Sequence, residues 1–189
     1  MKDRRLEFEN MLKFAAGRRK GFDDFMEWLN DTDFFTAPAS TKYHGASEGM
    51  LLCHSLNVCE RMLRRTEEAK EKGISMESMM IAALLHDMCK VGRYIPKRDE
   101  DGNITGYEYN KTVELPVGHG ERSVILIQQQ GLTLTLEEII AIRWHMGAYD
   151  DAARGNIRAL DEAFKGHPLA VMLHLADMEA TWLDEQEEE

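Results

Sequence analysis

Residues 79–90 read MMIAALLHDMCK, an apolar run that is followed at once by an adjacent histidine and aspartate. The run is typical of a helix that is buried on most sides, and Ser75 with Ser78 three residues later provides a helix start. Ionisable side chains at the end of a buried helix cost free energy unless a partner compensates them. His86 and Asp87 are therefore the first candidates for a functional site.

The sequence on both sides of this run predicts more helices and one hairpin. Helical patterns cover residues 6–15, 22–29, 47–70, 75–89, 120–130, 136–146 and 168–184. Between Asp99 and Leu115 the pattern changes: a turn at Asp101-Gly102-Asn103 precedes the alternating stretch ITGYEYNKTVEL, which is typical of a small β-hairpin. The expected fold class is all-α, a helical bundle with one small β-hairpin insertion.

Length and composition indicate one domain. The chain has 189 residues, of which 43% are hydrophobic and 30% charged, and these values are ordinary for a globular protein. No internal repeat or low-complexity linker divides it. We expect a single domain over residues 1–189: N-terminal helices in 1–40 that pack on a core of 41–183, and a solvated acidic tail at 184–189.

The charge limits the partners of the protein. A net charge of −11 argues against binding to long nucleic acid, which needs a basic surface. A small phosphorylated substrate remains compatible with this charge, because a local metal centre can supply positive charge. The sequence leaves the oligomeric state open.

Other features of the sequence concern location and cysteine chemistry. No apolar stretch is long enough to span a membrane, and the N-terminal MKDRRLEFENMLKF has no signal-peptide core, so we expect a cytoplasmic protein without membrane contact. Cys53, Cys59 and Cys89 lie in apolar helical contexts and form no CxxC pair. They are interpreted as packing thiols.

Two more polar residues interrupt apolar helices elsewhere in the chain. His54 lies in GMLLCHSLNV, and Asp177 lies in PLAVMLHLADM. Each of them alone is compatible with a core residue whose hydrogen bonds are satisfied. Together with His86 and Asp87, they are best explained by one shared partner, a divalent cation bound by imidazole nitrogens and carboxylate oxygens.

The order His54, His86-Asp87, Asp177 resembles the H…HD…D signature of the HD superfamily of metal-dependent phosphohydrolases. The resemblance covers residues 42–183 and includes the local frames GMLLCHSLNV, AALLHDMCKVGRY and LHLADMEAT. It implies a helical HD-domain bundle that hydrolyses phosphomonoesters or phosphodiesters with the help of a metal ion.

His119 in PVGHGERSV and His145 in AIRWHMGAYD extend the resemblance to the two-metal branch of the superfamily. There Asp87 would bridge two ions, with His54, His86 and Asp177 on the first ion and His119 and His145 on the second. A helix-start histidine and a histidine packed beside a tryptophan are the structural alternatives. The cofactors implied are one or two divalent ions per chain, of Mn, Fe, Mg, Co, Ni or Zn.

Further residues are candidates for catalysis and substrate binding. Asp87 would hold the attacking water as well as the ions, and Lys90, one turn after His86, is placed to meet a phosphate oxygen. Arg122 is a better phosphate candidate than Arg143, which faces elsewhere on an ideal helix. His44 and Trp144 are candidate substrate contacts, although a loop histidine is an equally ordinary interpretation of His44, and packing is the more ordinary one for Trp144.

The expected function is metal-dependent hydrolysis of a small phosphomonoester or phosphodiester, such as a nucleotide, through a metal-activated water. One alternative is a mixed-valent di-iron oxygenase of the same superfamily, because the same ligands serve both chemistries. A second alternative is a non-catalytic metal-binding signalling domain. Against the latter, structural zinc sites are closed by four N/S ligands and use no bridging carboxylate. The sequence alone does not choose the substrate, the metal, or a monoesterase over a diesterase.

Overall fold

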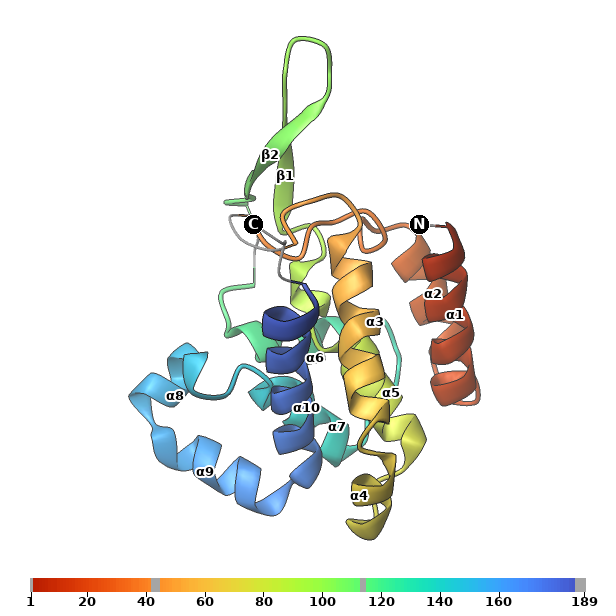
Figure 1. Cartoon of the computed structure of the whole chain (residues 1–189), viewed down its shortest axis with the longest axis vertical. Coiled ribbons are helices and arrows are strands. Elements are labelled where there is room, and N and C mark those ends of the chain that lie inside the picture. The colour runs from red at the N-terminus through yellow and green to blue at the C-terminus, as the bar shows by residue number, and fades with distance from the viewer. Residues whose placement is uncertain (1, 42–44, 113–114, 186–189) are drawn as a thin grey trace.

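The computed structural model describes residues 2–41, 45–112 and 115–185. Helices dominate it, and two antiparallel strands form a hairpin that projects from one end (Figure 1). The α-helices are α1 (Lys2–Ala16), α2 (Phe22–Asn30), α3 (Met50–Leu63), α4 (Thr66–Glu71), α5 (Met76–Leu85), α6 (His119–Gln129), α7 (Leu136–Trp144), α8 (Asp151–Gly155), α9 (Ile157–Gly166) and α10 (Pro168–Glu179). Short 3₁₀ turns cover Met88–Lys90 and Gly147–Tyr149, and a π-helical turn covers Ala180–Asp184. The prediction of an all-α protein with one small hairpin is confirmed.

Helix α5 lies at the centre of the bundle. Its residues from Met79 to Leu85 are buried without interruption, because the helix is apolar on all sides and packs against α1, α3, α7 and α10. The Ser75 hydroxyl accepts a hydrogen bond from the Ser78 amide and caps the start of the helix, as its sequence indicates. The polar pair His86-Asp87 is thereby delivered to the middle of the molecule.

The N-terminal segment is tied to the bundle by a buried carboxylate. Glu138, near the start of α7, is fully buried. Its two carboxylate oxygens accept hydrogen bonds from Nη1 and Nη2 of Arg19, at 2.6 and 2.7 Å. It also accepts hydrogen bonds from the Ser78 hydroxyl and the Thr135 amide. One carboxylate thus joins the loop after α1 to α5 and α7, with its lone pairs satisfied.

One expected helix is divided in the structure, and two observed helices were not expected. The helix predicted over 47–70 is broken, since α3 ends at Leu63 and α4 begins at Thr66. There the Arg65 amide donates a hydrogen bond to the Met62 carbonyl, and the Thr66 hydroxyl donates one to the Leu63 carbonyl. These contacts end the regular hydrogen-bond pattern of the α-helix. The short helices α8 and α9 were not predicted, although Ile157, Leu160 and Phe164 give α9 an apolar face at helical spacing.

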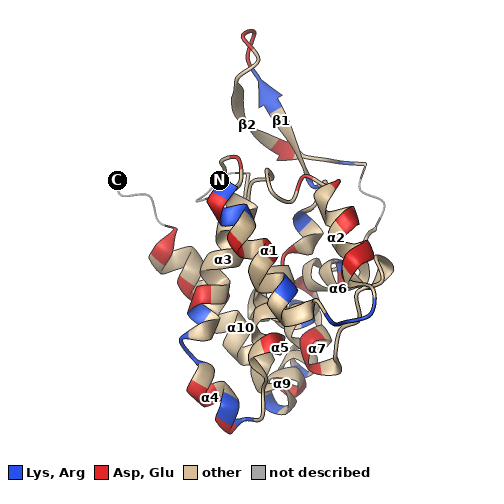
Figure 2. Cartoon of the chain, turned by 90° about the vertical axis from the view of Figure 1, so that its right-hand side faces the viewer, with Lys and Arg blue, Asp and Glu red and all other residues tan. Residues whose placement is uncertain are grey.

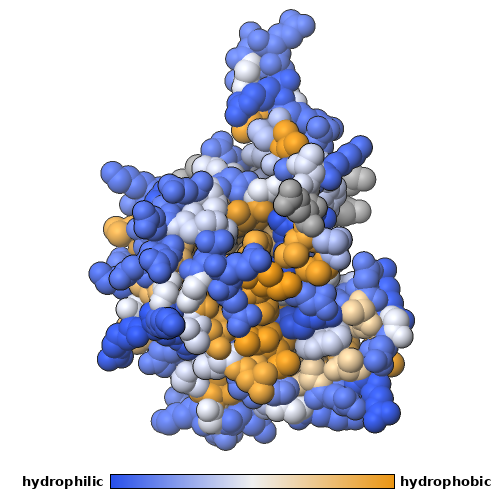
Figure 3. Space-filling model, turned by 180° about the vertical axis from the view of Figure 1, so that it is seen from behind, coloured by the Kyte–Doolittle hydropathy of each residue, from blue (hydrophilic) through white to orange (hydrophobic). Residues whose placement is uncertain are grey.

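The hairpin begins earlier than predicted, because β1 (Tyr94–Arg98) precedes the stretch 99–115 and only β2 (Ile104–Tyr109) lies within it. The strands pair so that Tyr94 lies opposite Tyr109. The Asp99 carboxylate accepts hydrogen bonds from the Asp101 and Asn103 amides and so closes the turn. The second strand ends at Tyr109, earlier than the alternating pattern up to residue 115 suggests. Most of the hairpin is hydrophilic, and apolar residues lie at its base (Figure 3).

The surface is charged and mixed in sign. On the face seen in Figure 2, acidic and basic residues are interspersed along the helices. No helix in the described part of the chain combines the length and the hydropathy that crossing a membrane requires.

Candidate metal centre

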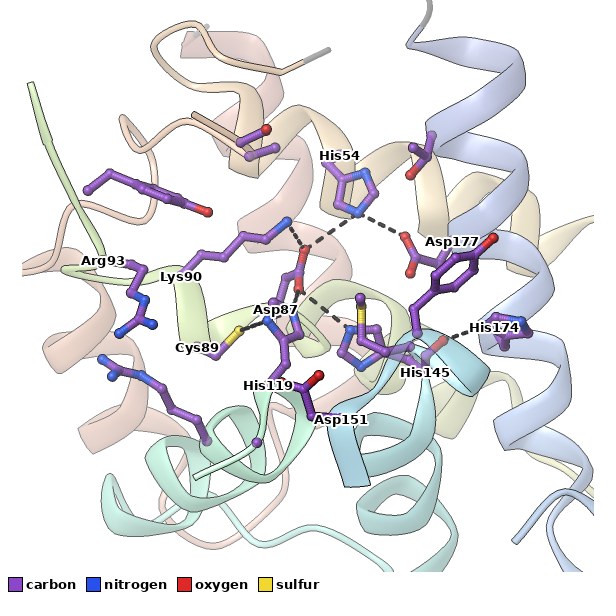
Figure 4. A pocket seen from close by; sticks show the side chains of 18 of the residues that line it. His54, Asp87, Cys89, Lys90, Arg93, His119, His145, Asp151, His174 and Asp177 are labelled. Atoms are coloured by element: carbon purple, nitrogen blue, oxygen red, sulfur yellow. Dashed lines mark hydrogen bonds and ion pairs between the residues drawn. The ribbon is translucent and has the colours of Figure 1, made fainter. Parts of the chain in front are cut away.

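A cavity of about 1200 Å³ opens among the helices, and five of the six predicted metal ligands line it. His54 comes from α3, Asp87 follows the end of α5, His119 begins α6, His145 follows α7, and Asp177 lies on α10 (Figure 4). The sixth ligand, His86, is fully buried directly behind Asp87. The helical packing therefore brings together all six residues, from five separate segments of the chain.

Two of the histidines are oriented by the same kind of contact, from Nδ1 to the carbonyl oxygen three residues earlier. The Nδ1 atom of His86 lies 2.8 Å from the Ala83 carbonyl oxygen, and Nδ1 of His145 lies 2.7 Å from the Ile142 carbonyl oxygen. Each ring thus caps a carbonyl of the last turn of its own helix, which otherwise has no helical partner. In the neutral form Nδ1 carries the proton, and Nε2 is left as an acceptor or metal ligand.

The Asp87 carboxylate lies between two sets of nitrogen atoms. Its Oδ2 atom faces the Nε2 atoms of His54 at 3.6 Å and of His86 at 3.4 Å. Its Oδ1 atom faces the Nε2 atoms of His119 at 2.7 Å and of His145 at 3.6 Å. Each oxygen of one buried carboxylate therefore points to a different histidine pair, which is the arrangement that a bridging ligand needs.

The far side of the cavity is formed by His54 and the C-terminal helix. His54 Nε2 lies 3.2 Å from Asp177 Oδ1 and 3.2 Å from His86 Nε2. Its other nitrogen, Nδ1, lies 3.0 Å from Oε1 of Glu185, which also accepts a hydrogen bond from the Asn57 amide group at 2.9 Å. A carboxylate behind the second nitrogen of a ligating histidine fixes its orientation and makes it a stronger ligand.

The chemistry of these groups fits a divalent cation. Three overlapping sets have ligand atoms within 4.8 Å of one another: His54, His86 and Asp87; His86, His145 and Asp177; Asp87, His119 and His145. Within the described residues, the fully buried Nε2 atom of His145 has no hydrogen-bond partner. A buried imidazole nitrogen of this kind is costly alone, and a metal ion would satisfy it. Buried histidine and aspartate groups at this place can thus hold a metal ion.

The electrostatics of the centre keep its carboxylates ionised. Burial alone would raise the pKa of Asp87, but the charge of Lys90, the nearby His86 ring and a hydrogen bond with His119 outweigh it and hold this pKa well below its usual range. The pKa of Asp177 is likewise lowered, because its contact with His54 outweighs the effect of burial. Both side chains are therefore available as anionic ligands.

The surroundings raise the pKa of two of the histidines and lower that of a third. Burial lowers the pKa of His54, but hydrogen bonds with Asp177 and Glu185 outweigh it and raise this pKa to about 10. The pKa of His119 rises to about 10 as well, because Cys89 and Asp87 outweigh its burial. Burial lowers the pKa of His145, which stays neutral.

Two of the predicted substrate contacts line the cavity. Lys90 lines the cavity with its Nζ atom 2.6 Å from Asp87 Oδ2, and Arg122 also lines it. His44 lies outside the described residues. Trp144 is a correction: it is nearly buried, contributes nothing to the cavity wall, and packs with Ala153, Leu160 and Ala163 in a separate small cluster. Neighbouring residues on a helix face different directions, so Trp144 points away where His145 points in.

Several residues at the centre were not predicted from the sequence. Cys89, interpreted as a packing thiol, lines the cavity with its Sγ atom 3.3 Å from Nε2 of His119. Its position two residues after Asp87 is the signal that could have suggested this. The expected solvated tail also needs correction at its start, since Asp184 pairs with Arg61 and Glu185 with His54. Residues 186–189 lie outside the described part of the chain.

Comparisons of the chain with protein-family models, with curated proteins and with solved structures found no match.

Proposed function

We propose that the protein is a metal-dependent phosphohydrolase of the HD type that acts on a small phosphomonoester or phosphodiester. The single observation that carries this proposal is the position of Asp87, with each carboxylate oxygen facing a different pair of imidazoles. A cavity of about 1200 Å³ in front of it has room for a nucleotide-sized compound. The order of the ligands along the chain, which resembles the HD signature, supports the same assignment.

The roles of the residues follow from their positions. His54, His86, Asp87 and Asp177 would hold one divalent ion, and His119 and His145 would hold a second one that shares Asp87. Ions held there would supply an activated water molecule and polarise phosphoryl oxygens. Burial keeps His145 neutral, and the carbonyl contacts of His86 and His145 direct their Nε2 atoms toward Asp87.

Lys90 would contact the phosphoryl group. It is the cation next to Asp87, and burial of its side chain is offset by this carboxylate, which raises its pKa. Its ammonium group therefore stays charged and can donate a hydrogen bond to a phosphate oxygen at the mouth of the centre. We expect Lys90→Met to weaken turnover while the metal content is retained.

The test is a phosphatase and phosphodiesterase panel on metal-stripped protein, with Mn²⁺, Mg²⁺, Fe²⁺ or Co²⁺ added back. We expect hydrolysis that a chelator abolishes and added metal restores, and that Asp87→Asn eliminates. Asp161→Asn, which changes an exposed carboxylate on α9, is the matched control and should keep full activity. Turnover that survives both chelation and the Asp87 change would refute the proposal. Iron-dependent consumption of oxygen without hydrolysis would favour the oxygenase alternative instead.

A further inference from the structure

Two arginines line the cavity beyond the ligands. Arg93 follows the turn Met88–Lys90, and Arg122 lies on α6 three residues after His119. Both line the same cavity as Lys90. Figure 4 shows Arg93 on the same side of Asp87 as Lys90 and Cys89, with Asp177 on the opposite side.

These arginines differ from others in the protein in their partners. Arg143 is bound by the carboxylates of Asp150 and Glu121, and Arg19 by that of Glu138. Among the residues that the structure describes, neither Arg93 nor Arg122 forms an ion pair. The Nε and Nη1 atoms of Arg122 are buried and have no hydrogen-bond partner there.

Two guanidinium groups that line one cavity without a counter-charge are unfavourable. Buried donors without acceptors cost free energy, and two like charges that face one cavity repel each other. Burial and the nearby charge of Arg93 both lower the pKa of Arg122, which is the expected sign of such a repulsion. An anion between the arginines would remove both costs.

Arg93 is also held in position by an aromatic side chain. Its guanidinium carbon lies 5.6 Å from the centre of the Tyr109 ring, and this ring lies 5.5 Å from that of Tyr94 across the base of the hairpin. Contact with an aromatic face restricts the guanidinium without using its hydrogen-bond donors. These donors stay available to a ligand in the cavity.

We propose that Arg93 and Arg122 form a subsite for a second phosphate group, so that the substrate carries two phosphates. This inference rests on the proposed function, in which the metal centre and Lys90 take the first phosphate. A guanidinium fork matches phosphate geometry in two-point contacts, and two such forks suit a dianionic group. The substrate class is a nucleoside diphosphate or another bisphosphate.

The experiment compares non-hydrolysable probes that carry one or two phosphonate groups, which stand in for the phosphates of a substrate. Methylphosphonate has one, methylenediphosphonate has two adjacent groups, and butane-1,4-diphosphonate has two that are separated. Their binding to Mn²⁺-loaded protein is measured by titration calorimetry for the wild type, Arg93→Gln, Arg122→Gln and the double variant. Arg158→Gln, on an exposed arginine of α9, is the matched control.

We expect the double variant to bind the preferred diphosphonate at least about tenfold more weakly, because charged hydrogen bonds are lost, and methylphosphonate within about twofold of the wild type. The better-bound diphosphonate distinguishes adjacent from separated phosphates. An equal loss for one-group and two-group probes, or no loss for either, would overturn the subsite. Arg93→Lys and Arg122→Lys keep the charge and provide the same comparison if a glutamine variant fails to fold.

The melting temperature provides a second measurement that does not depend on activity. Removing an unpartnered buried charge should leave the melting temperature of ligand-free Arg122→Gln unchanged or higher, whereas a structural role would lower it.

Failure of the proposed function can be distinguished from failure of the subsite. If no phosphoester is hydrolysed but arginine-dependent diphosphonate binding persists, the proposed function fails. If hydrolysis is metal-dependent but the arginine changes affect all probes alike, only the subsite fails.

Discussion

At the scale of single residues, Asp87 links every part of the candidate centre. Lys90 and four histidines surround its two oxygens, and its carboxylate is almost fully buried. A buried carboxylate with this many potential ligand partners costs free energy unless cations or donors compensate it. Its neighbours would therefore decide which ions the centre could hold.

The number of bound ions can be tested by single substitutions. The first ion would have four protein ligands and the second only three, so the second should bind more weakly. We expect His119→Ala or His145→Ala to leave about one ion per chain and Asp87→Ala to disturb both, as bridging requires. Elemental analysis measures the content, and His167→Ala, which removes a histidine paired with Glu137 outside the centre, is the control.

The melting temperature should follow the same order. Stabilisation by a bound ion increases with its affinity, so His54→Ala and Asp177→Ala should lower the melting temperature of the metal-loaded protein more than His119→Ala does. Full activity and unchanged metal content in both His119→Ala and His145→Ala would show that these histidines are structural and that the two-metal interpretation is wrong.

Metal binding should release protons in a defined pH range. His54 and His119, whose pKa values in the metal-free protein are raised to about 10, are protonated at pH 8, whereas ligating imidazoles are neutral. Loading both sites at pH 8 should thus release about two protons, and the affinity should rise with pH up to about 10. His145, with a lowered pKa, should contribute none.

Calorimetry in buffers of different ionisation enthalpy measures this proton release. His119→Ala should reduce it by about one proton, because it removes one protonated group. A heat of binding that does not depend on the buffer would contradict the prediction.

At the scale of elements, the C-terminal segment reaches from α10 back to α3. After the π-helical turn Ala180–Asp184, the Glu185 carboxylate contacts both His54 and Asn57, and its side chain is almost fully buried. Asp184 pairs instead with Arg61 on the outer side of α3. Two neighbouring acidic residues thus hold the same segment, but only one of them touches a predicted ligand.

This difference provides a matched pair of variants. Glu185→Gln should weaken binding of the first ion by about 10–100-fold, because His54 loses the carboxylate that orients it and increases its basicity. Asp184→Asn removes a surface ion pair only and should change metal affinity by less than about twofold. Competition with a chromophoric chelator measures both. Equal affinities for Glu185→Gln and the wild type would show that Glu185 only attaches the chain end.

At the scale of the whole molecule, the hairpin projects from one end of the bundle (Figure 1). Its residues from Ile95 to Glu108 contribute nothing to the main hydrophobic core, and the two tyrosines at its base are the part that lines the cavity. The stability of the bundle should therefore be independent of the outer part of the hairpin.

Shortening the hairpin tests this independence. Replacing residues 98–105 by Asn-Gly joins Lys97 to Gly106, which already lie opposite each other, through a two-residue turn. We expect an unchanged helical circular dichroism spectrum, unchanged metal content and a melting temperature within about 4 °C of the wild type, which corresponds to a stability change below about 1 kcal/mol. Loss of metal or of cooperative unfolding would show that the hairpin supports the centre.

The hydrophobic pattern by itself determined the fold class. The apolar run before His86 has to be buried on all sides, and the turn at Asp101-Gly102-Asn103 separates two strands. Isolated polar residues on apolar helices are best explained by a common partner. These features are local, since they depend on period, turn chemistry and the cost of burying charge. The sequence therefore predicted the set His54, His86, Asp87 and Asp177.

Tertiary packing decided the rest. Glu185 lies 131 positions from His54 in sequence, and no local pattern connects two residues so far apart. The direction of Trp144, the contact of Cys89 with His119, and the break between α3 and α4 likewise depend on neighbours from other elements. Periodicity tells which side of a helix is buried, but only the packing of helices determines which partner each buried side chain meets.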